Sequence, residues 1–359
     1  MVTHPSPPRF YGARPNSTLA HSVLEAVRRI LRRSNSKALG FSARAIYTAA
    51  ADRKGKYLAE PQRALASILQ PHDPLAREHN LPAIDLVVPF VEKDLPSLEL
   101  VIAHALLNVR NPIERIILLT PQNREGTRPR FVRPESDALL VDIRTRYPSI
   151  QVRFDQDVLG SEILDELESR FGKGDRNAGW VTQQLIKLSA ALASESRASL
   201  ILDADTILLS KKTWLTADGK QLLQVANEYH NDFMKHVLLH FGVPKKLKLS
   251  FVTHHQLMQT DVVKQMFPQG ATSLLEWWMS STDSIGRDLG DYEAYGAFLA
   301  HHYPARVAFG SFANLFSPHL TAFLEDLKNS GSTPSELIPG YCSVSFHSWA
   351  QVDRVARGN

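Results

Sequence analysis

The stretch RASLILDADTILLSKK, from Arg197 to Lys212, decides the fold class. Its apolar run Leu200-Ile201-Leu202 shows no polar alternation, which is typical of a central strand buried on both faces. Asp203 and Asp205 follow this run directly. Because ligands of open α/β sheets bind beyond the carboxyl ends of the strands, the two acids predict a binding site there.

The two acids stand one residue apart, so both face one point if the chain is extended. Two carboxylates that close repel each other unless a cation lies between them. Mg²⁺ or Mn²⁺ takes oxygen ligands, often one or two carboxylates completed by substrate phosphates. Asp203 and Asp205 therefore predict metal-bridged binding of a phosphorylated substrate. The alternative is that Asp203 caps the strand while Asp205 is solvated in a turn.

Runs of strand type alternate with helical segments before this stretch. We expect strands in AIDLVVPFV, RIILLTPQ and SIQVRFDQD (83–91, 115–122 and 149–157), and helices over 94–109, 161–171 and 177–196. Alternation with short links predicts an α/β fold with a mostly parallel sheet flanked by helices.

The first 80 residues differ in texture from the rest. Residues 1–17 are rich in Pro and Ser and are predicted to be disordered. Residues 19–33 form an amphipathic pattern with arginines opposite the apolar face, within a segment (23–56) of nine basic and two acidic residues. This basic helix is either a solvated cap or a docking element for an anionic membrane surface. We expect a helical extension over 1–80 and a catalytic domain over 81–359.

Composition bounds the class of protein. The chain has 359 residues, 43% of them hydrophobic, with a formal net charge of +4 and a single cysteine, Cys342. One cysteine excludes an internal disulfide, which favours a cytoplasmic protein, with contact at the inner membrane face through 19–33 left open. The sequence has no zinc-type cysteine pairs and no phosphate-binding glycine loop. We therefore expect no nucleic-acid partner. The oligomeric state stays open.

Four motifs occur in a fixed order along the chain: GWVTQQLIKL (179–188), ILDADTILL (201–209), SFVTHHQLM (250–258) and DYEAYGAFL (291–299). With the opening strand that ends at Pro89 and Phe90, this order resembles the GT-A class of nucleotide-sugar glycosyltransferases, and within it a poorly characterised bacterial group. The resemblance covers about residues 83–350. It implies a GT-A-like (Rossmann-like) fold, a nucleotide-sugar donor and a glycan or glycolipid acceptor.

The resemblance also implies roles for individual residues. Asp203, Asp205 and a late histidine, His347, are implied as ligands of Mn²⁺ or Mg²⁺ on the donor diphosphate. The residues implied to border the donor are Pro89, Phe90, Lys93 and Asp94 after the first strand, Gln184 and Lys187 on the preceding helix, and Ala204 between the two acids.

Acceptor chemistry adds a second group of candidates. A sugar hydroxyl needs a general base if the transfer inverts configuration, and by the resemblance Asp291 or Glu293 is the candidate. A helix would separate these two acids, so we expect only one to be the base; the alternative is that both are acids at a helix N-terminus. His254, His255 and Trp277 are the candidates for acceptor contact.

Three rival hypotheses remain. A haloacid-dehalogenase-like phosphatase has a DxDx(T/V) motif that DADTI (203–207) resembles, but it carries the motif after its first strand, whereas three strand-like runs precede DADTI here. A metal-dependent nucleotidyltransferase would share the sheet and the metal. A non-enzymatic glycan-binding or scaffold protein would keep the fold without the reaction.

Overall fold

The computed structural model describes residues 73–346, except 123–128, 173–174, 227–229, 245–249, 284–285 and 318. The predicted helix 19–33 and His347 lie outside the described residues. Within the described part of the chain, none of the helices combines the length and the apolar character needed to cross a bilayer. Leu75 is buried in the core and Asp73 accepts a hydrogen bond from the Thr213 backbone N–H at 2.8 Å, so the chain already packs on the sheet domain before residue 80.

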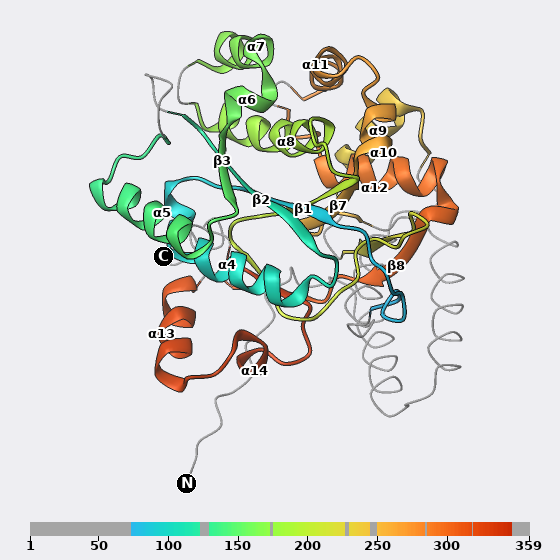
Figure 1. The fold of residues 1–359 in the computed structure, drawn as a ribbon. Coiled ribbons are helices and arrows are strands. Elements are labelled where there is room, and N and C mark those ends of the chain that lie inside the picture. Colours follow the sequence, from blue (N-terminus) through green and yellow to red (C-terminus); the bar gives the residue numbers. More distant parts are fainter. Residues whose placement is uncertain are drawn as a thin grey trace, which may run out of the picture.

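The centre of the molecule is a five-stranded sheet in the order β3-β2-β1-β4-β7 (Figure 1). Its strands are β1 (Ile84–Pro89), β2 (Ile113–Thr120), β3 (Ile150–Phe154), β4 (Ala198–Leu202) and β7 (His255–Gln259). The first four pair in parallel, and β7 runs antiparallel to β4 with His255 opposite Leu202. The expected mostly parallel α/β sheet is confirmed.

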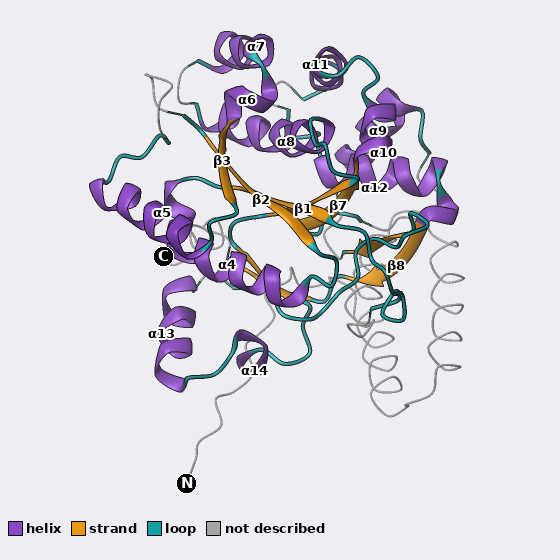
Figure 2. Ribbon diagram, in the orientation of Figure 1, coloured by secondary structure: helices purple, strands orange, loops and turns teal. Residues whose placement is uncertain are grey.

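Helices cover both faces of this sheet (Figure 2). One face packs on α4 (Leu95–Asn108) and α5 (Pro134–Arg146). The other packs on α6 (Asp155–Leu159), α7 (Ser161–Phe171), α8 (Arg176–Leu192), α10 (Thr260–Met266), α11 (Ala271–Met279) and α12 (Asp291–His302), with α9 (Asn231–Phe241) against α12. Successive side chains of a strand point to opposite faces, so Leu200 joins one core and Ile201 the other. This explains why β4 is apolar throughout.

Short strands bring distant parts of the chain to the end of β4. β5 (Thr206–Leu208), β10 (Ser343–Ser345) and β9 (Asn314–Phe316) form a small sheet, and β6 (Gln221–Val225) pairs with β8 (Val307–Ser311). In the small sheet Ser345 lies opposite both Thr206 and Phe316. The remaining elements are η1 (Glu92–Asp94), η2 (Pro304–Arg306), α13 (Leu320–Ser330) and α14 (Pro334–Leu337). The small sheet thus places residues near 316 and 345 beside the acidic segment.

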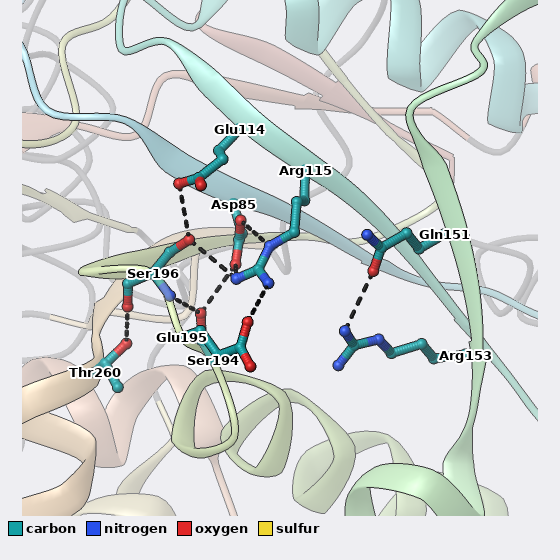
Figure 3. Close-up of polar contacts among 9 residues, drawn as sticks. All are labelled: Asp85, Glu114, Arg115, Gln151, Arg153, Ser194, Glu195, Ser196 and Thr260. Carbon is teal, nitrogen blue, oxygen red and sulfur yellow. Dashed lines mark hydrogen bonds and ion pairs between the residues drawn. The ribbon is translucent and has the colours of Figure 1, made fainter.

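An ionic network ties the strands together at the opposite, amino-terminal edge (Figure 3). Asp85 of β1 is fully buried. Its carboxylate accepts two bonds from the Arg115 guanidinium, at 3.0 and 2.8 Å, and one from the Ser194 hydroxyl at 2.9 Å. The same guanidinium binds Glu195 at 2.9 Å. Breaking a buried ion pair of this kind strongly destabilises a protein. The network therefore fixes β1, β2 and the segment before β4 relative to one another.

Candidate functional site

The segment after β4 turns sharply at the carboxyl edge of the sheet. The Thr206 backbone N–H donates to the Asp203 carbonyl at 3.0 Å, which closes a turn through Ala204. The Ala204 carbonyl in turn accepts a bond from the Ser97 hydroxyl at 3.0 Å. Ser97 belongs to the first turn of α4, so the acidic turn is attached to the start of the helix that follows β1. Both predicted acids therefore stand where the ends of β1 and β4 meet.

The Asp203 carboxylate is held by three side chains from three different elements. Lys187 of α8 lies 2.7 Å from Oδ1, and the Tyr292 hydroxyl of α12 donates to the same oxygen at 2.9 Å. His254, in the turn before β7, places Nδ1 3.2 Å from Oδ2. Asp203 is 8% exposed. Protein groups therefore engage both of its oxygens.

Lys187 links this carboxylate to a second one. Its Nζ lies 3.4 Å from Oδ2 of Asp291, the first residue of α12, and 4.3 Å from the centre of the Tyr292 ring. Lys187 and Asp291 are each 3% exposed. Two buried carboxylates thus share one ammonium group, and the three residues carry one net negative charge.

The pKa values of the two carboxyl groups that share Lys187 shift in opposite directions. Burial opposes ionisation of Asp203, but Lys187 and then His254 outweigh it and hold its pKa below the usual range. Burial raises the pKa of Asp291, and the negative charge of Asp203 adds to the rise while Lys187 opposes it. Of the two, Asp291 is therefore the carboxyl that exchanges its proton nearer neutral pH. Tyr292 keeps its proton, because burial and then Asp203 raise its pKa well above the usual value.

Asp205 and Asp94 offer oxygen ligands beside this centre. Asp205 is partly exposed. Burial raises the pKa of Asp94 to about 6, and the negative charges of Asp205 and Asp203 contribute to the rise. The described residues contain no group of three or more His, Cys, Asp or Glu placed to hold a metal ion. Mg²⁺ sites often use one or two carboxylates completed by substrate phosphates, and Asp205 with Asp94 fits a site of that kind.

The late histidine implied by the resemblance lies outside the described residues, but the chain leading to it does not. The Phe346 backbone N–H donates to the Asp205 carbonyl at 2.8 Å. The last described residue of that segment is therefore bonded to the backbone of the second acid. A metal-binding role for His347 stays a prediction.

The two adjacent histidines have different surroundings. His254 has a φ of 56°, in the left-handed region that side chains rarely adopt, and its carbonyl accepts the Asp203 backbone N–H at 2.9 Å. Strain of this kind persists where surrounding contacts over-determine it, often at functional sites. His255 is buried, with its ring 5.5 Å from Trp214 and 5.4 Å from Phe312. Only His254 of the pair contacts Asp203.

Several other predicted site residues lie in the protein interior. Phe90 is buried, with its ring 6.2 Å from that of Phe131. Gln184 accepts the Asp291 backbone N–H at 3.3 Å, so it caps the start of α12. Glu293 is fully buried and accepts the Phe251 backbone N–H at 2.8 Å. These contacts position elements around the site.

The three remaining predicted site residues lie in different surroundings. Pro89 is buried at the end of β1, and the exposed Lys93 side chain lies 3.9 Å from Asp94. The structure does not bring Trp277 to the site, because its side chain is fully buried between Phe267 and His236 at 6.0 and 5.6 Å. An apolar pair such as Trp277-Trp278 gains more from core packing than from exposure.

Sequence reasoning missed Tyr292 and the aromatic residues near His254. Tyr292 stands between the two candidate acids in the motif DYEAYG, and its proximity to Asp203 depends on how α12 packs. Phe312 and Phe316 lie 5.9 and 5.5 Å from the His254 ring. Their segment, GSFANLF, carries no signal beyond two phenylalanines four residues apart.

Replacing Lys187 with methionine is expected to lower the free energy of unfolding by at least about 3 kcal/mol. The substitution leaves the buried carboxylates of Asp203 and Asp291 without their cation, and removing one partner of a buried ion pair typically has an effect of that size. Urea denaturation of the variant and the wild type measures it. Lys264→Met, at an exposed position of α10, is the control and should change stability by less than about 0.5 kcal/mol. An equal effect of the two substitutions would contradict the role of Lys187 as the cation shared by Asp203 and Asp291.

His255 is expected to make the fold sensitive to acid. Burial, aided by His254, lowers its pKa from 6.5 to about 3. Below pH 6.5 the unfolded chain therefore takes up a proton that the folded chain refuses, and the free energy of unfolding falls by up to about 1.4 kcal/mol per pH unit until about pH 3. His255→Phe should retain the ring contacts and show a shallower decline between pH 7 and 4 in urea denaturation. Parallel curves for the variant and the wild type would refute this.

A pocket lies at the opposite edge of the sheet. This open pocket of about 570 Å³ is lined by Arg197, Asp218, Gly219, Thr260, Asp261, Lys264 and Arg306. Asp261 binds the Arg306 guanidinium at 2.8 and 3.0 Å, so this cation already has a partner of opposite charge. The buried lysine and the strained histidine are both at the carboxyl edge, which favours that edge as the functional site.

Fold and site together define an α/β protein with an acidic site at the carboxyl edge of a mostly parallel sheet. No protein-family model and no curated protein sequence matches the chain. The chain is similar to the solved mannosyltransferase Ktr4p from S. cerevisiae, at 11% identity over 80% of this chain and 84% of the other, with a TM-score of 0.44.

Two further solved structures are similar at comparable levels. One is the galactosyltransferase LgtC in complex with donor and acceptor sugar analogues, at 13% identity over 73% of this chain and 87% of the other, with a TM-score of 0.41. The other is mouse xyloside xylosyltransferase 1, at 14% identity over 74% of this chain and 98% of the other, with a TM-score of 0.39. The function proposed below is argued from the residues of the site.

Proposed function

We propose that the protein is a glycosyltransferase that moves a sugar from a nucleoside-diphosphate donor to a glycan or glycolipid acceptor, with Mn²⁺ or Mg²⁺ held at Asp205. The observation that carries the proposal is the charge arrangement at the end of β4. Lys187 and His254 contact the Asp203 carboxylate, and Asp205 is partly exposed near a second acid, Asp94, whose pKa is raised by burial and by the charges of Asp205 and Asp203. Two neighbouring carboxylates at a sheet edge suit a cation shared with substrate phosphates.

The two acids of the DxD motif have separate roles in this proposal. Asp205, together with Asp94, holds the cation, which when bound would neutralise negative charge on the departing diphosphate. Asp203 holds Lys187, Tyr292 and His254 in place around the sugar, because its carboxylate bonds to all three. Preorganised groups of this kind need no rearrangement during the reaction.

We further propose Asp291, rather than Glu293, as the general base of an inverting transfer. Asp291 lies with Lys187 and Asp203 at the start of α12, and burial raises its pKa. Burial thus brings the pKa of this carboxylate closer to the pKa of an effective base near neutral pH. Glu293 instead accepts the backbone N–H of Phe251 in the core. The helix separates the two acids as expected.

The proposal is tested by incubating the purified protein with a panel of nucleotide sugars and Mn²⁺. Release of nucleoside diphosphate, measured with and without added glycosides, should occur with at least one donor and stop when the metal is chelated. If no donor is hydrolysed or transferred, the proposal fails.

Adding nucleoside triphosphates with a sugar 1-phosphate, and a phosphate monoester, to this panel separates the rival hypotheses. Release of pyrophosphate from a nucleoside triphosphate, with transfer of the nucleotide to the sugar 1-phosphate, would indicate a nucleotidyltransferase, and release of orthophosphate from the phosphate monoester would indicate a phosphatase. Binding of glycans with no turnover of any donor would indicate a glycan-binding protein of this fold.

A further inference from the structure

Phe316 is a large aromatic side chain that stays exposed beside the buried charge centre. It is 38% exposed, at the end of β9. Ser345 of β10 lies opposite it in register, and Thr206 of β5 lies opposite Ser345. The side chain is therefore held by the small sheet that begins directly after Asp205, and its position relative to the acids is fixed by backbone pairing.

Phe316 belongs to an aromatic cluster that reaches the Asp203 carboxylate. Its ring meets the His254 ring edge-on at 5.5 Å, and the buried Phe312 lies 6.5 Å from Phe316 and 5.9 Å from His254. His254 in turn places Nδ1 3.2 Å from Asp203. Phe312 and His254 thus both contact the exposed ring and help to hold it in place.

An exposed aromatic ring next to carboxylates matches the surface of a sugar. A pyranose ring has an apolar face of C–H groups, which packs on an aromatic face, and a rim of hydroxyls, which bond to polar groups. The ligand chemistry indicated is therefore the apolar face of a pyranose.

The position of Phe316 distinguishes the sugar of the acceptor from the donor. The cation site of Asp205 and Asp94 adjoins the loop after β1, which is one neighbour of β4. His254, which contacts Phe316, precedes β7, the neighbour on the other side of β4. The proposed cation site is thus attached to the neighbour of β4 on one side and Phe316 to the neighbour on the other, which favours the acceptor, rather than the donor, as the sugar that meets Phe316.

We propose that Phe316 is the stacking platform for the acceptor sugar, a specificity-determining residue with Phe312 and His254 as its support. The proposal rests on the glycosyltransferase function proposed above. Trp277, which the sequence offered as a candidate for acceptor contact, is buried in the core, and Phe316 takes the aromatic role in its place.

Direct binding of acceptor probes tests the platform separately from turnover. Methyl α- and β-glycosides of glucose, galactose and mannose are titrated into the full chain with Mn²⁺ and a nucleoside diphosphate, and binding is followed by saturation-transfer NMR. The variants are Phe316→Ala, Phe316→Leu, which retains apolar bulk without a ring face, and Phe316→Trp, which retains a ring. Leu107→Ala, at an exposed position of α4, is the control.

At least one glycoside should bind to the wild type and to Leu107→Ala with equal affinity. Because an aromatic contact contributes about 0.5–1.5 kcal/mol beyond area burial, Phe316→Ala and Phe316→Leu should weaken binding about three- to tenfold, and Phe316→Trp should restore it. Absence of glycoside binding by the wild type, or equal affinity in Phe316→Ala, would overturn the proposal.

The donor side provides a further check on the same variants. A fall in affinity for the nucleotide sugar of more than about threefold in Phe316→Ala, with the affinity for glycosides unchanged, would place the ring at the donor and overturn the assignment to the acceptor. Glycoside binding that depends on Phe316 while no donor is turned over would leave the platform standing and reject the proposed transferase function.

Discussion

Replacing Asp205 with asparagine is expected to reduce glycosyl transfer by about a thousandfold. The change keeps the size of the side chain and removes the negative charge that, with Asp94, would hold the cation. A metal ion contributes several kcal/mol of charge stabilisation to a departing phosphate group, and about 4 kcal/mol corresponds to this loss of rate. Initial rates at saturating donor and Mn²⁺, with the donor found in the nucleotide-sugar panel, measure it.

The matched control for this variant is Asp165→Asn, an aspartate at an exposed position of α7. It should retain the wild-type rate, and both variants should unfold at the same urea concentration as the wild type. If Asp205→Asn retained more than about a tenth of the rate, the cation would not be held there.

Asp291→Asn is expected to lower kcat by about 10²- to 10⁴-fold, the contribution typical of a general base. Because burial raises the pKa of Asp291, the wild-type rate should fall as the pH drops through a value above the ordinary range of an aspartate. The base must be ionised to accept the hydroxyl proton, so this acidic limb belongs to Asp291 and should disappear in the variant. A pH–rate profile of kcat/KM measures both effects.

Glu293→Gln is the control, because glutamine still offers an oxygen to the Phe251 N–H. It should retain the acidic limb. If Asp291→Asn changed kcat by less than threefold and retained the limb, Asp291 would not be the base. NMR of the product anomer shows independently whether the transfer inverts configuration, as a reaction with a general base of this kind requires.

Much of the framework could be predicted because its signals are local. β1, β2, β3 and β4 are short apolar runs, and α7 and α8 have a helical period. β7 was not predicted as a strand, because HQLMQ shows only a weak alternation of apolar and polar residues and begins with the second of two adjacent histidines. β5, β9 and β10 have three residues each, and strands that short have no period to detect. Their pairing depends on the tertiary fold.

The site could be predicted in part for the same reason. The position of Asp203 and Asp205 follows from the strand before them, and that of Lys187 near them from the helix that leads into this strand. The ion pair of Lys187 with Asp203, at 2.7 Å, depends on the rotation of α8 about its axis. The sequence pattern leaves this rotation open. Tyr292 and Phe316 come from elements far along the chain, so only the packing of α12 and the pairing of β9 reveal them.

Calorimetric titration of Mn²⁺ and nucleoside diphosphates into the wild type and Asp205→Asn tests the central claim most directly. Binding of at least one nucleoside diphosphate should require Mn²⁺ in the wild type, and Asp205→Asn should weaken it by at least tenfold, about 1.4 kcal/mol, while Asp165→Asn leaves it unchanged. Equal binding by Asp205→Asn and the wild type, or binding indifferent to Mn²⁺, would contradict a cation site at the end of β4.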